Sequence, residues 1–292
     1  METSSSQERN YNTISPSAKS LLLLKGLTDI PYARAAAELI SRPEQYVPDY
    51  ANTDLTFWMR VLHFEHRYRT IDQLLAGLNI HNILELSSGF SFRGLAAIQD
   101  NDTYYIDTDL PDLIHTKQDF IASLQDKNTR PKGTLEVLPL NAVDGAQFEA
   151  ITALLPPGPV AIVNEGLLMY LGIEEKKQLC GNIRAALLQR GGYWITADIY
   201  IKTGQRAPAL KMNDQLQTFL EQHRVEDNMF ESFEEAEAFF KGEGLIIDKE
   251  AEPEYVQSGV LKYLMASATE EQLADMGKAG KIQTTWRLKA ES

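Results

Sequence analysis

The chain of 292 residues contains a single cysteine, Cys180, which excludes an internal disulfide. No cluster of cysteines and histidines accompanies it, which argues against a structural zinc site. We therefore expect a protein without a metal that resides in a reducing compartment, the cytoplasm.

Long apolar runs are also missing. A membrane-spanning helix needs about 20 consecutive apolar residues, whereas the leucine run Leu21–Leu24 fills only one helical turn. The first ten residues are polar and contain no signal-peptide core. We expect residues 1–15 to form a disordered arm, and we expect no membrane association.

Basic residues are scarce. Lysine and arginine total 28 against 41 aspartates and glutamates, which gives a formal net charge of −13. Proteins that bind a nucleic-acid backbone usually carry a basic face that displaces counterions, and this chain has no long basic run. We therefore expect a small molecule or a peptide as its partner rather than nucleic acid.

The first eighty residues have the apolar spacing of helices, interrupted by glycine and proline. The spacing predicts three helices, over residues 17–25, 31–40 and 54–78. They would form an N-terminal helical cap over residues 16–80, ahead of a main domain over residues 81–292. Residues 201–230 do not fit the pattern of that domain, and we expect an insertion there that covers the binding crevice.

From residue 81 onward, short β-rich runs alternate with helical stretches. The clearest helix is Ile173–Arg190, which has two glutamates near its positive end and two glycines after its last residue. Such alternation implies parallel strands with helices on both faces of the sheet. The last two strands have no obvious helix between them, which predicts a hairpin at one edge. The predicted strands are Asn82–Leu86, Thr103–Asp107, Leu135–Leu138, Val160–Asn164, Tyr193–Asp198, Leu245–Glu250 and Thr284–Leu288.

The predicted fold class is therefore α/β, a Rossmann-like, doubly wound, seven-stranded and mostly parallel sheet with an N-terminal helical cap. In such a sheet, ligands bind outside the carboxyl ends of the strands. The first strand ends in a turn with Ser87 and Gly89, small residues that let a ligand approach the backbone. A tight turn without a ligand explains the same residues. The turn lacks Gly-x-Gly-x-x-Gly, which argues against a nucleotide-dependent oxidoreductase.

Carboxylates follow the second strand. Asp109 comes twenty positions after Gly89, the separation at which a carboxylate can accept hydrogen bonds from a ribose diol. Asp107 is an alternative for the same role, and a solvated loop carboxylate is the ordinary explanation of either. After the third strand, Asn141 or Asp144 can face an adenine edge, although capping of the next helix explains Asp144 equally well.

Glu165 directly follows the apolar run Val160–Val163. A carboxylate buried without a partner is costly, and a cationic ligand with a sulfonium and an ammonium group would be a suitable partner. Arg67 or Arg69 can instead pair with Glu165. A guanidinium in this position can also bind a ligand carboxylate through two hydrogen bonds.

These residues resemble the leucine carboxyl methyltransferase family, which includes enzymes that methylate a phosphatase C-terminus and bacterial O-methyltransferases of polyketide pathways. Its Asp-Leu-Pro…Lys signature is similar to Asp109–Pro111 with Lys117, and its Glu-Gly-x-Leu-x-Tyr-Leu signature is similar to Glu165–Leu171. The arginine, Ile-Asp and glycine turn of the family correspond more loosely to Arg67, Ile71-Asp72 and Leu86–Arg93.

The resemblance implies S-adenosylmethionine as cofactor. It implies that Arg67 binds the methionine carboxylate and that Glu165 lies near the methionine portion. It further implies that Gly89 lines the cofactor, that Asp109 holds the ribose, and that the Asp144 region faces the adenine. The chain departs from the family at four positions, Ser87, Ser91, Phe92 and Asn141.

We therefore expect an S-adenosylmethionine-dependent O-methyltransferase that acts on a carboxylate or a hydroxyl. A carboxylate acceptor needs no general base, whereas a hydroxyl does. Tyr170, His63, His66 and His115 are candidates for such a base only by residue type. The alternatives are a non-catalytic or degenerate cofactor-binding protein of the same fold, favoured by Ser87, Ser91 and Phe92, and a nucleotide-dependent oxidoreductase.

Overall fold

The computed structural model describes residues 15–126, 129–202, 225–253, 255, 257–278 and 280–291. The arm predicted for residues 1–15 lies outside this part except for its last residue, which begins a helix. Most of the insertion predicted for residues 201–230 also lies outside it.

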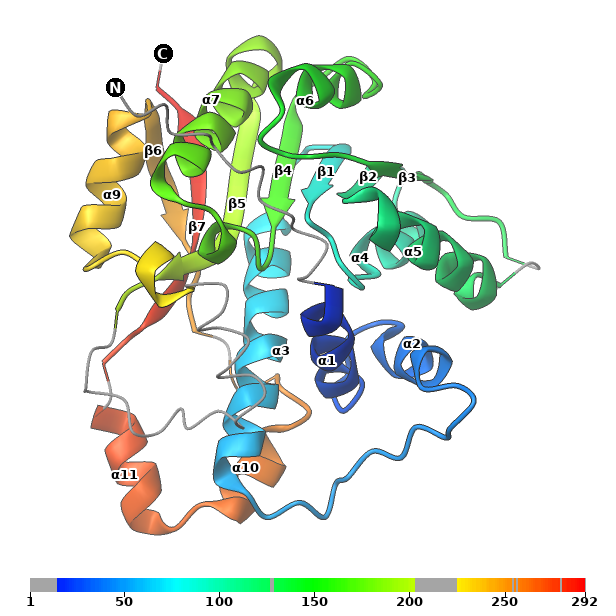
Figure 1. The fold of residues 1–292 in the computed structure, drawn as a ribbon, viewed down its shortest axis with the longest axis vertical. Coiled ribbons are helices and arrows are strands. Elements are labelled where there is room, and N and C mark those ends of the chain that lie inside the picture. Colours follow the sequence, from blue (N-terminus) through cyan, green and yellow to red (C-terminus); the bar gives the residue numbers. More distant parts are fainter. Residues whose placement is uncertain are drawn as a thin grey trace, which may run out of the picture.

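A seven-stranded sheet with the order β3-β2-β1-β4-β5-β7-β6 forms the centre of the molecule (Figure 1). The strands β1 to β5 pair in parallel, and β7 runs antiparallel to both β5 and β6. The predicted fold class and all seven predicted strands are confirmed. The strands are β1 Asn82–Leu86, β2 Tyr104–Asp109, β3 Thr134–Pro139, β4 Val160–Asn164, β5 Gly192–Tyr200, β6 Leu245–Glu250 and β7 Gln283–Ala290.

Helices cover both faces of the sheet (Figure 1). Every residue of β1 and of β4 is buried, as expected for central strands with a helix layer on each side. On one face α6 (Gly145–Thr152), α7 (Ile173–Arg190) and α9 (Phe233–Gly242) share a hydrophobic cluster with the strands. The opposite face packs against α4 (Arg93–Asp100) and α5 (Pro111–Leu124), and against α1 (Ser15–Lys25), α2 (Ala33–Ile40) and α3 (Leu55–Leu75).

The long helix α3 joins the sheet to the rest of the N-terminal helices. Ile71 and Leu74 near its end lie in the same cluster as Val163 of β4 and Ile195 of β5. The Thr70 and Thr285 hydroxyls hydrogen-bond across α3 and β7 at 2.7 Å. The N-terminal helices therefore share a core with the sheet, and the domain boundary near residue 80 stays a prediction.

The connection between β6 and β7 differs from the predicted hairpin. The two strands are antiparallel neighbours, but α10 (Leu261–Ser267) and α11 (Glu270–Lys278) lie between them in the chain. These helices pack away from the sheet, where Leu264 joins a cluster with Trp58 and Val61 of α3. Both helices are short, with seven and nine residues, so neither contains enough turns to give a clear helical period.

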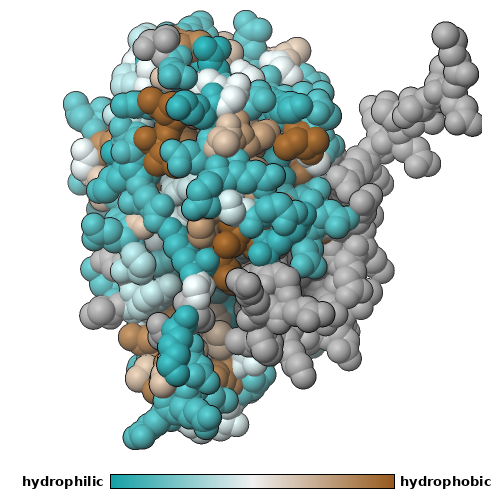
Figure 2. All heavy atoms as spheres, turned by 90° about the vertical axis from the view of Figure 1, so that its left-hand side faces the viewer, coloured by the Kyte–Doolittle hydropathy of each residue, from teal (hydrophilic) through white to brown (hydrophobic). Residues whose placement is uncertain are grey.

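The surface on the side of α9 is mostly hydrophilic in its coloured part, with small separate apolar areas (Figure 2). Large exposed apolar side chains occur on elements scattered through the fold, and single ones of this kind are normal on a protein surface. No helix within the described residues is long and apolar enough to cross a membrane.

Candidate functional site at the carboxyl edge of the sheet

The strand order reverses between β1 and β4. The chain leaves β1 toward β2 on one side and leaves β4 toward β5 on the other, and Leu86 lies beside Asn164 at the ends of these two strands. Open α/β sheets bind ligands in the crevice at such a switch point. The loops that begin at Ser87 and Glu165 therefore meet where a ligand is expected.

The turn after β1 has the backbone conformation of a small-residue loop. Ser87 has φ 51° and Gly89 has φ 52°, the left-handed region that costs a side chain energy. Asp109 accepts hydrogen bonds from the N–H groups of Gly89 at 2.8 Å and Leu110 at 2.7 Å. Among the described residues, no atom outside the turn lies within 4 Å of the position that a Cβ at Gly89 would take, so none of them fills the space in front of the turn.

Asp107 lies behind this turn rather than at the crevice. Its side chain is fully buried and pairs with the Lys117 ammonium at 2.9 Å. Lys117 also donates a hydrogen bond to the Ser88 hydroxyl at 2.8 Å. Burial raises the pKa of Asp107, although Lys117 acts in the opposite direction. Of the two carboxylates considered for a ribose, Asp109 is the one at the open turn.

A buried charge cluster surrounds Glu165 after β4. Its five members are Lys25, Arg67, Arg93, Glu165 and Asp198. Glu165 pairs with the Lys25 ammonium at 2.7 Å, and the guanidinium groups of Arg67 and Arg93 lie 3.9 and 3.7 Å from its oxygens. Burial raises the pKa of Glu165, but the three cations outweigh it and hold this pKa below its usual value. Arg67 thus pairs with Glu165, as one of the alternatives predicted, whereas Arg69 pairs with Glu65.

Asp198 of β5 is the fifth member of this charge cluster. It pairs with Arg67 at 3.2 Å and accepts a hydrogen bond from the Asn164 side chain at 2.7 Å. The successive backbone N–H groups of residues 166, 167 and 168 donate to it at 2.6, 2.6 and 3.1 Å. Gly166 has φ 87°, which allows the loop to turn around the carboxylate. Asp198 therefore fixes the loop that carries Glu165.

Several buried polar atoms of the charge cluster have no hydrogen-bond partner among the described residues. They are Nε of Arg67, Nε and Nη2 of Arg93, and Oε2 of Glu165. Buried polar groups are nearly always hydrogen-bonded in native proteins. These cationic and anionic atoms together fit a polar ligand that carries both a carboxylate and an ammonium group.

The loop after β3 contains the other two predicted residues. The Asp144 carboxylate accepts hydrogen bonds from the N–H groups of Ala146 and Gln147, both at 3.0 Å, and thereby caps α6. Hydrogen bonding to these groups lowers the pKa of Asp144. Capping, one of the two predicted roles, is thus confirmed. Half-buried Asn141 follows Leu140, whose N–H donates to the Asp109 carbonyl at 2.8 Å, so it borders the β2 loop.

The candidate bases occupy different surroundings. Tyr170 ends the short 3₁₀ helix η2 (Leu168–Tyr170) and is half-buried. His63 Nε2 lies 2.6 Å from the Tyr200 hydroxyl, and burial together with Arg67 lowers the pKa of His63 to about 3. His66 stacks on Tyr255 at 4.6 Å, and His115 is exposed on α5.

Lys25, Arg93 and Asp198 are members of the charge cluster that the sequence analysis did not select. The sequence contained a usable signal for Asp198. It is the last residue of the predicted strand Tyr193–Asp198, and Asp109 and Glu165 likewise come just after predicted strands. Lys25 had no such signal, because only tertiary packing brings α1 to Glu165, and Arg93 entered the sequence analysis only as the last residue of the stretch Leu86–Arg93.

No family model matches the chain, and no curated protein matches it either. Its structure is similar to a DUF574 family protein from Streptomyces avermitilis, with a TM-score of 0.52 and 14% identity, over 94% of this chain and 97% of that one. The complex of PigF with SAH gives a TM-score of 0.48 at 14% identity, over 82% of this chain and 60% of PigF. The apo form of SibL, an S-adenosylmethionine-dependent methyltransferase, gives 0.45 at 11% identity, over 87% and 61%. At these identities the likeness concerns the fold alone, and the leucine carboxyl methyltransferase family stays a prediction.

Proposed function

We propose that this chain binds S-adenosylmethionine at the carboxyl edge of β1 and β4 and transfers its methyl group to an oxygen of a small molecule or peptide. The observation that carries the proposal is the buried charge cluster at the switch point, where Nε of Arg67 and Oε2 of Glu165 have no hydrogen-bond partner among the described residues. A zwitterionic amino-acid group is the ligand that satisfies both. The resemblance of Asp109–Pro111 and Glu165–Leu171 to the leucine carboxyl methyltransferase family supports the same assignment.

The residues divide along the cofactor as follows. Arg67 and Lys25 are the candidates to bind the methionine carboxylate, and Glu165 is the candidate to accept the ammonium group. Ser87 and Gly89 provide the turn along which the cofactor lies. Asp109 supports that turn through the Gly89 N–H and is the candidate for the ribose, and Asn141 borders the adenine end.

The sulfonium of the cofactor supplies an already activated methyl group. The protein then has to position the acceptor oxygen in line with it, and orientation of this kind is worth up to about 7–11 kcal/mol in favourable systems. A carboxylate acceptor is ionised near neutral pH and needs no base. For a hydroxyl acceptor, the candidate base is the pair of Tyr200 and His63. His63 Nε2 lies 2.6 Å from the Tyr200 hydroxyl, and the Arg67 guanidinium lies 5.7 Å from the Tyr200 ring.

Isothermal titration of the purified protein with S-adenosylmethionine and S-adenosylhomocysteine tests the proposal. We expect micromolar binding by the wild type. Arg67→Ala and Glu165→Gln each remove one partner of a buried charge pair, which costs about 2–5 kcal/mol in comparable sites, so either variant should lose measurable binding. Arg34→Ala is the control, because this side chain is 54% exposed and its partners are Glu38 of the same helix and the Tyr50 hydroxyl.

Circular dichroism on each variant separates a lost site from a lost fold. A folded wild type that binds neither compound contradicts the proposal and supports a degenerate cofactor site around Ser87. Binding of a nicotinamide dinucleotide instead would favour the oxidoreductase alternative.

A further inference from the structure

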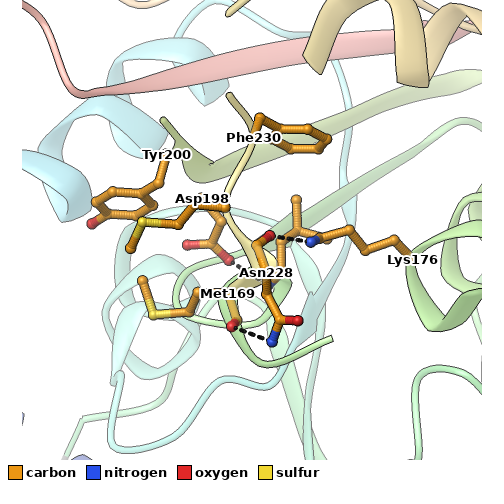
Figure 3. A pocket seen from close by; sticks show the side chains of 8 residues that line it. Met169, Lys176, Asp198, Tyr200, Asn228 and Phe230 are labelled. Atoms are coloured by element: carbon orange, nitrogen blue, oxygen red, sulfur yellow. Dashed lines mark hydrogen bonds between the residues drawn. The ribbon is translucent and has the colours of Figure 1, made fainter. Parts of the chain in front are cut away.

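Two loops border the proposed cofactor site, and the loop after β4 has its own support. Asp198 accepts hydrogen bonds from three backbone N–H groups of this loop. The Asn228 side chain donates a hydrogen bond to the Met169 carbonyl at 3.0 Å, and the Asn228 carbonyl accepts one from Lys176 (Figure 3). These contacts do not reach the turn after β1, which therefore needs a separate support.

The turn after β1 contains a strained residue. Ser87 has φ 51°, a left-handed conformation that is unfavourable for any residue with a Cβ. Such conformations persist where the surrounding structure imposes them. The next residue, Ser88, is held by all three of its polar groups. Its N–H donates to the Thr108 carbonyl at 2.9 Å, and its carbonyl accepts from the Ser91 N–H at 2.8 Å. Its hydroxyl accepts a third hydrogen bond, from the Lys117 ammonium at 2.8 Å.

Lys117 reaches the turn from α5 and is fully buried. Its ammonium also pairs with the fully buried Asp107 carboxylate at 2.9 Å, which compensates its charge. A hydrogen bond from an ionised donor is stronger than one between two neutral groups. The contact between Lys117 and Ser88 is therefore a strong one, and it joins residues 29 positions apart in the sequence.

Aromatic rings extend this contact along α5. Phe120 lies three positions after Lys117, on the same face of the helix. Its ring stacks on Phe90 at a centroid distance of 5.4 Å and on Phe92 at 6.5 Å. The helix α5 thus contacts the chain between β1 and α4 at Ser88, Phe90 and Phe92.

We infer that Lys117 is a positioning residue, which holds the turn after β1 through the Ser88 hydroxyl in the conformation that receives the cofactor. This inference rests on the proposed function. Lys117 acts on the cofactor only through the turn. With Ser88 fixed, Ser87 keeps its positive φ, and the Gly89 N–H stays on the Asp109 carboxylate at 2.8 Å. The contact from α5 therefore lets a serine occupy a position that favours glycine.

Titration with S-adenosylhomocysteine tests the inference in the Ser88→Ala variant. This substitution removes the hydroxyl but leaves the ion pair of Lys117 and Asp107 in place. Loss of a hydrogen bond to a charged group should weaken binding about tenfold or more. Glycine adopts φ 51° without steric cost, so Ser87→Gly added to Ser88→Ala should recover most of the affinity. Ser123→Ala is the matched control, because this exposed serine of α5 bonds the Asp119 carbonyl of its own helix at 2.9 Å.

The lysine itself needs a paired substitution. Lys117→Met alone leaves Asp107 as a buried carboxylate without its cation, which is strongly destabilising. The double variant Lys117→Met/Asp107→Asn removes both charges together. It should lose affinity to a similar extent as Ser88→Ala, because both lack the same contact with the turn.

Hydrogen exchange without a ligand gives a readout that a general loss of stability does not produce. In Ser88→Ala the amides of residues 87–92 should exchange about tenfold faster or more. The amides of residues 166–168 should keep their rates, because Asp198 binds them directly and Asn228 supports the adjoining Met169 (Figure 3). Faster exchange confined to the turn after β1 is the result expected of a positioning contact.

Three results would overturn the inference. They are an unchanged affinity of Ser88→Ala, a loss of affinity that Ser87→Gly does not reduce, and exchange that is unchanged or rises equally in both loops. A wild type that binds no S-adenosylhomocysteine contradicts the proposed function instead. The exchange rates of residues 87–92 then still decide whether Lys117 holds the turn.

Discussion

Asp198 and Glu165 are buried carboxylates with different partners. Asp198 accepts hydrogen bonds from three successive backbone N–H groups and from Asn164, so its position is fixed by the loop around it. Glu165 has one oxygen bound to Lys25, and its other oxygen has no hydrogen bond among the described residues. Asp198 therefore suits a structural role beside the site, and Glu165 suits contact with a ligand.

Replacement of Asp198 by asparagine should destabilise the protein by about 3–5 kcal/mol, because it leaves Arg67 as a buried charge with a weakened partner. Asp144 also accepts two backbone N–H groups, but it does so at a solvent-accessible helix end. Asp144→Ala should therefore cost only about 1 kcal/mol. Urea unfolding of the two variants against the wild type measures the difference. Equal losses for the two variants would show that Asp198 is no more than a cap.

The charge cluster could be predicted only in part from the sequence, and the reason lies in which contacts are local. Asp109 and Glu165 follow strands, and the edge at which parallel strands end is determined by topology. Glu85 and Asp107 are partners in the register of β1 and β2, yet both are buried behind the turn. Whether a carboxylate near a strand end faces the crevice or the core depends on tertiary packing. The alternation of apolar and polar residues along a strand does not define that packing.

At the scale of elements, α3 connects two separate parts of the core. Its first half packs with α10, where the Trp58 ring stacks on Tyr263 at 4.8 Å, and its second half packs under the sheet. The strands were predictable because their apolar β-branched runs are bounded by turn residues. The helices α10 and α11 were not, because their apolar side chains pack into a cluster with Trp58 and Val61 of α3, which is some two hundred positions away in the sequence.

The Trp58→Ala variant tests this connection. Trp58 is fully buried and donates a hydrogen bond from Nε1 to the Asn52 carbonyl at 2.8 Å. Removal of a buried aromatic ring should cost about 3–5 kcal/mol, and hydrogen exchange should increase most over residues 261–278. Leu188→Ala, at a position 51% exposed on α7, is expected to change stability by no more than about 0.5 kcal/mol. Unchanged exchange in α10 would contradict the packing between α10 and α3.

At the scale of the whole molecule, the proposed cofactor site draws residues from both the N-terminal helices and the sheet. Lys25 of α1 and Arg67 of α3 pair with Glu165 after β4, and Arg67 also pairs with Asp198 of β5. Leu22 and Ile71 lie in the same hydrophobic cluster as Ile83 and Val163 of the sheet. Unfolding of the N-terminal helices alone would expose this cluster and break these ion pairs, so the two parts should unfold together.

Differential scanning calorimetry should therefore give one transition, and S-adenosylhomocysteine should move that transition as a whole. A ligand at one hundred times its dissociation constant stabilises the folded state by about 2.7 kcal/mol. Glu165→Gln should unfold in one transition as well but should show no shift with the ligand. Two transitions, of which the ligand moves only one, would mean that residues 16–80 form a domain with its own stability. In that case the ion pairs of Lys25 and Arg67 would contribute little to the association of this domain with the sheet.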